Sequence, residues 1–160
     1  MSNLATHYLI KAKDAYPYEL AEAMEALEYS LSYDDTNAAA HCLMGRMQLD
    51  QLKNYKEAFY HFEKALVADI DHFETYYYYA DALINYGDFE RVKKLLSYAQ
   101  QIPGICQACI LQRKSMIHEK NGDLIKAKKQ LKKALQLSTN GNERYNLKED
   151  LKRVQEKMKE

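Results

Sequence analysis

Hydrophobic residues recur along this chain at spacings of three and four, which is the pattern of amphipathic helices with one buried stripe. One such stripe is formed by Leu20, Ala23, Met24, Leu27 and Leu31. Turn residues interrupt the pattern and divide the chain into predicted helices. We expect helices over residues 4–15, 17–33, 37–51, 55–69, 71–85, 89–102, 105–120, 124–138 and 143–159. Pro17 suits the first turn of the second of these helices.

Three of the turns share one pattern, at intervals of about 34 residues. Each combines a turn residue, an apolar anchor, a polar pair and a small residue, and they begin at Asn54, Gly87 and Gly122. A bulky apolar residue and then an alanine follow the small residue of each turn at constant offsets. These pairs are Phe62 and Ala65, Leu96 and Ala99, and Leu131 and Ala134. A repeat of this length predicts stacked helical hairpins rather than one compact globule.

The last predicted helix has a separate role. Charged residues surround a single apolar stripe formed by Leu147, Leu151, Val154 and Met158. A stack of repeats leaves the apolar side of its last repeat open, so an amphipathic helix is needed to cover it. We therefore expect a cap at residues 142–159; the alternative is a helix that binds a partner.

The repeated residues resemble the tetratricopeptide repeat family, whose repeat is a pair of antiparallel helices with small residues where the helices cross. The third repeat matches best, through Tyr76, Tyr79, Ala80, Leu83, Gly87, Val92, Leu96, Ala99 and Pro103. Three helix positions depart from the family pattern, because Lys11, His41 and Lys114 stand where the family has a small, aromatic or apolar residue. Pro17 also lies in the turn of the first repeat, and the second repeat has one extra turn residue.

This resemblance implies an all-α fold, a right-handed superhelical solenoid of antiparallel helix pairs with about four repeats and a C-terminal capping helix. The repeats would cover residues 4–35, 37–70, 72–103 and 105–138. We expect residues 1–160 to form a single domain.

The composition favours helix and draws attention to tyrosine. The 160 residues include only two prolines and five glycines, but 14 tyrosines. Four of these are consecutive, at residues 76–79, and four consecutive residues cover the whole circumference of a helix. Tyr76 and Tyr79 have the core spacing, which places Tyr77 on another side together with Asp81 and Ile84.

Charge is distributed unevenly although the net charge of the chain is zero. Residues 1–80 carry 6 Lys and Arg against 13 Asp and Glu, a net charge of −7. Residues 81–160 carry 17 and 10, a net charge of +7. Solvated faces explain this difference most simply. End-to-end self-association or an acidic partner at the basic end are the alternatives.

Other sequence features do not indicate an enzyme or a cofactor. Cys106 and Cys109 form a CxxC, but no strand precedes it and no second CxxC completes a zinc site, so we interpret the pair as structural. The five histidines have no metal-ligand spacing, and no nucleophile, phosphate-binding or metalloprotease motif occurs. We expect no catalytic residue, no metal and no cofactor.

The densest basic run covers residues 126–133 and spreads over a broad face of its helix. Nucleic acid or anionic lipid could bind such a face. Aromatic residues are not interleaved with the lysines and the overall charge is neutral, so we interpret the run as a solvated face and expect no nucleic-acid partner.

The cellular compartment of the protein is predicted from targeting features that the sequence does not contain. The amino terminus has no basic start with a long apolar core, so we predict no secretory signal. No apolar stretch is long enough to span a membrane. Three cysteines do not suggest a disulfide framework, and we expect a cytoplasmic location.

The resemblance implies a protein-interaction scaffold or adaptor, in which the first helices of successive repeats line a concave groove for a peptide or partner protein. Carried over by position, the groove residues are Tyr8, Ala12, Cys42, Arg46, Leu49, Tyr77, Asp81, Ile84, Asn85, Gln112, Met116 and Lys120. Some family members hold chaperone tails with a basic-and-asparagine clamp, which these residues do not reproduce. The alternative function is a self-associating assembly module or a component of a larger complex, with a homo-oligomer as its simplest form.

Overall fold

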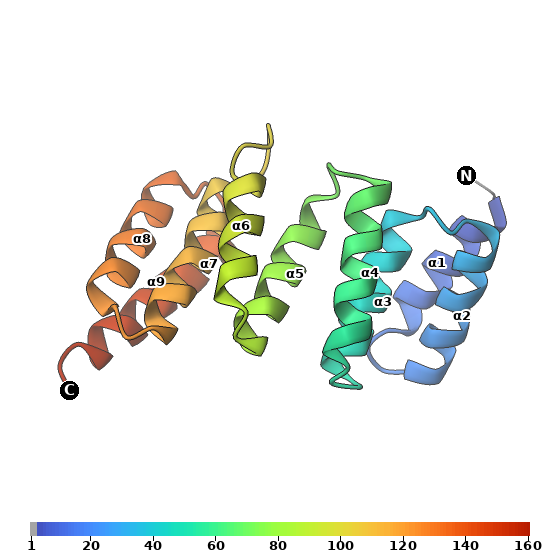
Figure 1. Ribbon diagram of the computed structural model, residues 1–160, viewed down its shortest axis with the longest axis horizontal. Helices are drawn as coiled ribbons and strands as arrows, with labels where there is room; N and C mark the ends of the chain where they lie inside the picture. The colour runs from blue at the N-terminus through green and yellow to red at the C-terminus, as the bar shows by residue number, and fades with distance from the viewer. Residues whose placement is uncertain (1–2) are drawn as a thin grey trace. The chain divides into compact units, whose positions relative to one another are not determined.

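The computed structural model describes residues 3–160, and helices joined by turns make up this part of the chain. In chain order they are α1 (Asn3–Ala15), α2 (Leu20–Tyr33), α3 (Ala38–Asp50), α4 (Tyr55–Ala68), α5 (Phe73–Tyr86), α6 (Phe89–Ala99), α7 (Gln107–Lys120), α8 (Leu124–Leu137) and α9 (Gly141–Lys157) (Figure 1). No β-strand occurs within residues 3–160. The predicted all-α class is therefore confirmed.

Two helix boundaries differ from the prediction by three residues, and the others by no more than two. The second helix begins at Leu20 rather than Pro17, because the chain turns through Tyr16–Glu19, where the Glu19 amide donates to the Ala15 carbonyl at 2.8 Å. The sixth helix ends at Ala99 rather than Ile102, since the residues that follow form turns that lead to Gly104 at a φ of 85°. The turns that contain Pro17 and Gly104 thus shorten α2 at its start and α6 at its end, relative to the apolar pattern.

The three repeated turns have a common physical cause. Asn54, Asp88 and Asp123 are the N-caps of α4, α6 and α8, and each side chain accepts a hydrogen bond from the amide three residues later, at 3.3, 3.1 and 3.1 Å. The residue before the last two caps is a glycine with positive φ, 93° at Gly87 and 78° at Gly122. The repeated sequence pattern therefore arises from the N-cap and the left-handed turn at which the second helix of each pair begins.

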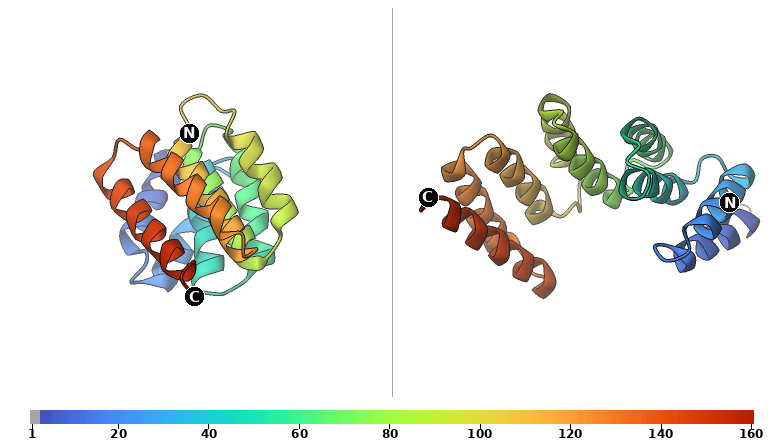
Figure 2. Two further views of the ribbon diagram at one scale, coloured as in Figure 1. Left: turned by 90° about the vertical axis from the view of Figure 1, so that its left-hand side faces the viewer. Right: turned by 90° about the horizontal axis from the view of Figure 1, so that it is seen from below.

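The contacts divide the chain into two compact units, the first ending at Ala82 and the second spanning Leu83–Glu160. In the first unit α1 packs on α2, α2 on α3 and α3 on α4, and the pairing of α1 with α2 can be followed in Figure 2. The core of these helices contains Leu9, Ala12, Ala23, Ala26, Leu27, Ala40, Leu43, Met44 and Met47. The Ser30 hydroxyl donates to the Ala5 carbonyl at 2.8 Å, which joins α1 and α2 inside this core.

Aromatic rings fill the space between α3, α4 and α5 in the first unit. Phe62 of α4 is fully buried and lies on the α3 backbone, since a Cβ placed on Gly45 would be only 2.8 Å from the Phe62 ring. The Phe62 ring stacks on Tyr79 with centroids 5.6 Å apart. Tyr76 and Tyr79 are 1% and 4% exposed, which confirms the core positions predicted for these two tyrosines.

In the second unit α6 packs on α7, α7 on α8 and α8 on α9. Its core contains Ala108, Leu111, Ala127, Leu131, Ala134, Leu147 and Val154, with Leu151 partly buried against it. The predicted cap is confirmed in Leu147, Leu151 and Val154 of α9. Met158 differs from the prediction, because it follows the end of α9 and is exposed. None of the helices within residues 3–160 is long and apolar enough to cross a membrane.

Two histidines join α3 and α4. The Nδ1 atoms of His41 and His61 are 2.9 Å apart, and the Nε2 atom of His41 lies 2.9 Å from the Asp35 carbonyl oxygen. Burial, and then the neighbouring His41, lower the pKa of His61 from 6.5 to about 4. The helix interface therefore requires His61 to be neutral.

The contact between Gly45 and Phe62 predicts a sharp effect of adding one methyl group. We expect Gly45→Ala to lower the free energy of unfolding by about 1–3 kcal/mol, because the buried Phe62 ring must move. Gly141→Ala is the matched control, since nothing lies within 4 Å of a Cβ at Gly141. Urea denaturation of both variants measures the difference. Equal stabilities would contradict the close approach of Phe62 to α3.

The depressed pKa of His61 predicts a loss of stability in mild acid. The unfolded chain binds this proton near pH 6.5 and the folded chain only near pH 4, so the stability that His61 contributes is complete above pH 6.5 and is lost as the pH falls towards 4. The control is His61→Gln, which keeps a polar side chain that does not titrate. We expect denaturation midpoints of the wild type to fall more steeply over this pH range than those of the variant. Parallel curves would contradict the assignment.

Candidate functional site

The first unit contains a small cavity of about 160 Å³ between α1, α3 and the start of α5. Its lining residues are Lys13, Tyr16, Ala39, Cys42, Leu43, Arg46, His72 and Glu74. We call it the Arg46 cavity. Two of the predicted groove residues, Cys42 and Arg46, lie on this cavity.

Arg46 is held by aromatic rings rather than by an acid. Its guanidinium carbon lies 4.0 Å from the centroid of the Tyr78 ring and 5.4 Å from that of Tyr16. Stacking of this kind contributes about 0.5–2 kcal/mol, more where the cation is desolvated. The Nε atom of Arg46 is buried and has no hydrogen-bond partner within residues 3–160. The rings thus hold the Arg46 side chain in place, while its Nε–H group can still donate a hydrogen bond.

Asp50, four residues after Arg46 on α3, accepts a hydrogen bond from a neighbouring side chain. The Tyr16 hydroxyl donates to Asp50 Oδ2 at 3.1 Å. Burial, and then this hydrogen bond, raise the pKa of Tyr16 above 10.0, so its hydroxyl stays protonated and keeps donating to Asp50. Tyr16 therefore contacts Arg46 through its ring and Asp50 through its hydroxyl.

Cys42 belongs to the wall of the Arg46 cavity and not to a reactive centre. Its side chain is 3% exposed. Burial raises the pKa of the thiol, an effect that a hydrogen bond with Thr75 reduces. A protonated and buried thiol is a poor nucleophile. Cys42 is only 3% exposed, so it offers little contact surface to a partner.

A second cavity, of about 480 Å³, lies within the second unit between the end of α5, α7 and α9. Its lining residues are Asn85, Gln112, Met116, Glu119, Lys120, Asp150, Arg153 and Lys157. Four of these, Asn85, Gln112, Met116 and Lys120, were predicted as groove residues. We call it the α7–α9 cavity.

Charges on the wall of the α7–α9 cavity are paired with one another. Glu119 accepts two hydrogen bonds from Arg153, at 2.9 and 3.0 Å, and one from Lys157 at 2.7 Å. Arg153 also donates to Asp150 at 2.6 Å, and Asp150 accepts from Gln112 at 2.7 Å. The bonds from Arg153 are the main cause that lowers the pKa of Glu119 to about 2. This network joins α7 to α9 and leaves its carboxylates satisfied.

The acidic and basic side chains of α9 were missed as cavity residues. Asp150, Arg153 and Lys157 are three and seven residues apart along α9, so they form a polar stripe beside the buried stripe of Leu147 and Val154. The sequence prediction was based only on the apolar stripe of α9, which forms the cap, and so did not identify this polar stripe. The spacing of these three residues along a helix that was already predicted could have revealed the polar stripe.

The remaining predicted residues line neither cavity. Tyr8 stacks on Tyr29 and Tyr33 of α2, with centroids 5.1 and 5.9 Å apart. Ile84 is only 1% exposed, so its predicted groove contact is wrong. Leu49, Tyr77 and Asp81 are half-buried. Within the tyrosine run it is Tyr78, rather than Tyr77, whose ring contacts Arg46.

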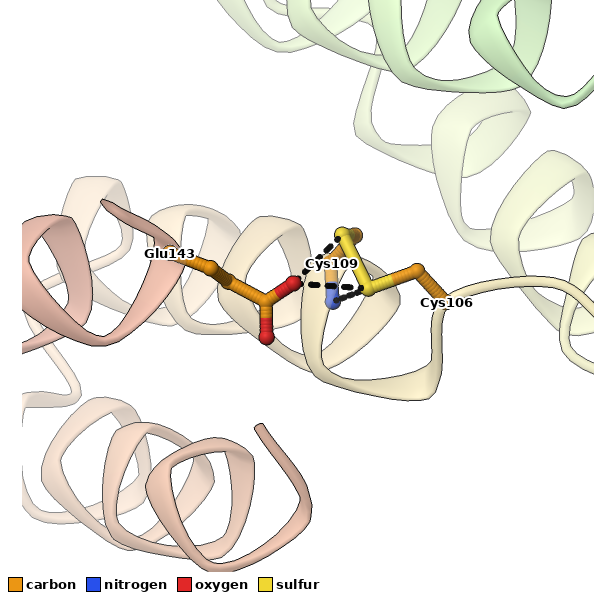
Figure 3. Close-up of side chains that lie close together, drawn as sticks. All are labelled: Cys106, Cys109 and Glu143. Carbon is orange, nitrogen blue, oxygen red and sulfur yellow. Dashed lines mark hydrogen bonds between the residues drawn. A yellow bond between two sulfur atoms is a disulfide. The ribbon is translucent and has the colours of Figure 1, made fainter. Parts of the chain in front are cut away.

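The CxxC has a neighbour that sequence reasoning did not identify. Cys106 is the N-cap of α7, and its sulfur accepts a hydrogen bond from the Cys109 amide at 3.1 Å. The two sulfur atoms are joined as a disulfide, which was not predicted. Glu143, in the first turn of α9, points its carboxylate at both sulfur atoms (Figure 3).

Comparison with known proteins finds solved structures with a similar fold, but no matching sequence family. No family model matches the chain, and no curated protein matches it. The structure of Pseudomonas aeruginosa pilF has a TM-score of 0.81 and 17% identity, covering 98% of this chain and 69% of that chain.

Two further solved structures are similar over most of their length. TTC0263, a thermophilic TPR protein of Thermus thermophilus, has a TM-score of 0.76 and 17% identity, covering 96% of this chain and 82% of that one. YrrB, described as a TPR protein with an unusual peptide-binding site, has a TM-score of 0.68 and 19% identity, covering 94% and 86%. With its antiparallel helix pairs, capped second helices and buried helix alanines, the chain has the tetratricopeptide repeat fold.

Proposed function

We propose that this protein is a protein-interaction module that holds a segment of its partner at the Arg46 cavity. The observation that carries this proposal is the state of Arg46, whose guanidinium stacks on Tyr78 while its buried Nε has no acceptor within residues 3–160. A buried donor without a partner lowers stability by about 1–3 kcal/mol. A backbone carbonyl or a carboxylate of a bound segment would remove that cost.

The chemistry around Arg46 suits recognition. Arginine and tyrosine are over-represented among the residues that dominate binding energies, and stacked rings keep the guanidinium in one orientation before a partner arrives. Lys13 and His72 add donors around the cavity, and Glu74 adds one carboxylate. The protonated thiol of Cys42 argues against nucleophilic catalysis here. The peptide-binding site described for YrrB supports the same general role.

The test removes the guanidinium and leaves the cavity wall in place. We expect Arg46→Ala to reduce recovery of the partners captured by the wild type at least about tenfold, the effect of losing one central arginine contact. Lys64→Ala is the control, because Lys64 lies in the same unit on an exposed surface of α4 and carries the same charge. Recovery is quantified by mass spectrometry after affinity capture from the native cell.

Arg46→Lys refines this test, because an ammonium group keeps the charge and loses the planar stack on Tyr78. We expect intermediate recovery. Thermal melts show whether the variants remain folded. If folded Arg46→Ala captured the same partners in the same amounts as the wild type, the Arg46 cavity would not be the binding site.

A second candidate function is self-association through opposite charges. The exposed side of α8 forms a groove lined by Ile125, Lys128, Lys129, Lys132, Lys133 and Gln136. The exposed side of α2 carries Glu22, Glu25 and Glu28 beside Tyr29 and Tyr33. The glutamates of one copy complement the lysines of another, and the tyrosine rings suit contact with lysine side chains.

A charge-swap experiment tests this second candidate. At low ionic strength we expect light scattering to give a mass above that of one chain, and at high salt the mass of one chain. Lys129→Glu with Lys132→Glu should abolish the assembly, and mixing this variant with Glu25→Lys and Glu28→Lys should restore it. A single-chain mass at every salt concentration would contradict self-association.

A further inference from the structure

Two cysteine sulfur atoms, joined as a disulfide, and one carboxylate converge where α7 and α9 begin in the second unit (Figure 3). Oε2 of Glu143 lies 3.2 Å from Sγ of Cys106 and 3.6 Å from Sγ of Cys109. The three ligand atoms lie within 4.8 Å of one another, and the three residues are partly buried. Local structure holds this arrangement, because Asn140 caps α9 by accepting from the Glu143 amide at 3.2 Å.

The Glu143 carboxylate faces sulfur and has no cation beside it. Glu143 makes no ion pair within residues 3–160. The adjacent Arg144 turns away and donates to the carbonyl oxygens of Leu135 and Ser138, at 2.6 and 3.2 Å. With the disulfide formed, neither sulfur carries a proton to donate. The oxidised pair therefore leaves a partly buried carboxylate without a compensating charge or donor among the described residues.

Reduction changes this balance. A phosphine reductant supplies two electrons and takes up the oxygen of one water molecule, the sulfur–sulfur bond breaks, and the two protons of that water complete two thiols. Cations of the zinc class bind the thiolate form of cysteine, so metal binding displaces those two protons. Two thiolates and a carboxylate in so small a space repel one another. A divalent cation that replaces the thiol protons removes this repulsion.

We propose that Cys106, Cys109 and Glu143 of the reduced protein form a binding site for a thiophilic divalent cation of the zinc class. Tetrahedral zinc, with bonds of about 2.3 Å to sulfur and 2.0 Å to oxygen, separates these atoms by about 3.5 Å. The distances from Glu143 to the two sulfur atoms, 3.2 and 3.6 Å, agree with this value. Rotation about one cysteine Cα–Cβ bond provides the roughly 3.8 Å separation of two thiolates on one ion.

The donor set determines which metals bind. Two thiolates favour Zn²⁺, Cd²⁺ and Co²⁺ over Mg²⁺ and Ca²⁺, which prefer oxygen ligands. Three protein ligands leave one coordination position for water. The ion would connect the first turn of α7 to the first turn of α9, and so add to the attachment of the capping helix. The sequence interpretation of no metal site rested on the lack of a second CxxC; Glu143 supplies a third ligand from a distant part of the chain.

The experiment uses the full chain, reduced with a phosphine and freed of metal by a chelator. Titration with Cd²⁺ follows the ultraviolet sulfur-to-metal charge-transfer band. We expect one equivalent per chain for the wild type and no such band for Cys109→Ser. Glu143→Gln should bind at least about tenfold more weakly, because a neutral amide is a poor metal ligand. Cys42→Ser is the matched control, since Cys42 is a buried cysteine of the first unit, and it should titrate like the wild type.

A second readout does not depend on spectroscopy. Zn²⁺ should raise the melting temperature of the reduced wild type and of Cys42→Ser, and not that of Cys109→Ser, because an ion that binds only the folded chain stabilises it. Absence of a charge-transfer band in the reduced wild type would overturn the proposal. Cd²⁺ affinity unchanged in Glu143→Gln, or lost in Cys42→Ser, would overturn the assignment of these three ligands.

Discussion

The close approach of helix backbones is the constraint on which the rest of this structure depends. Alanines at the crossings, Ala12, Ala58, Ala99 and Ala127 among them, are completely buried, and Gly45 meets the Phe62 ring without room for a methyl group. A helical hairpin cannot bury its apolar face alone, so each pair needs a neighbour at this short distance. Large rings then fill the space that the small residues leave between pairs.

This arrangement separates the side chains that hold the helices together from those that remain available to a partner. Residues between the two helices of a pair are mostly apolar, with Ser30 and the His41–His61 contact as polar exceptions, whereas charged residues remain on the sides that do not pack. In the first unit such a side contains Arg46, stacked on Tyr78 and without a hydrogen bond at Nε within residues 3–160. In the second unit the equivalent polar groups, Glu119 and Arg153, satisfy each other. The difference in pairing, rather than cavity size, distinguishes the first as the proposed binding site.

The period of the turns was enough to predict the fold, because the caps Asn54, Asp88 and Asp123 repeat a local interaction that sequence displays directly. The burial of Tyr76 and Tyr79 also followed from helical spacing. Individual site residues were harder to predict. Tyr8 contacts α2 and Ile84 is buried, since the neighbours of a side chain come from helices far away in sequence. Glu143 could not be paired with Cys106 for the same reason.

Site-specific photo-crosslinking in the native cell tests the central claim, binding at the Arg46 cavity, most directly. A photoreactive residue in place of Lys13, on the wall of that cavity, is compared with the same residue in place of Lys64 on the exposed side of α4. Binding at the Arg46 cavity predicts a discrete crosslinked partner from position 13 that is absent from position 64. Equal crosslinking from both positions, or a partner crosslinked only from position 64, would contradict it.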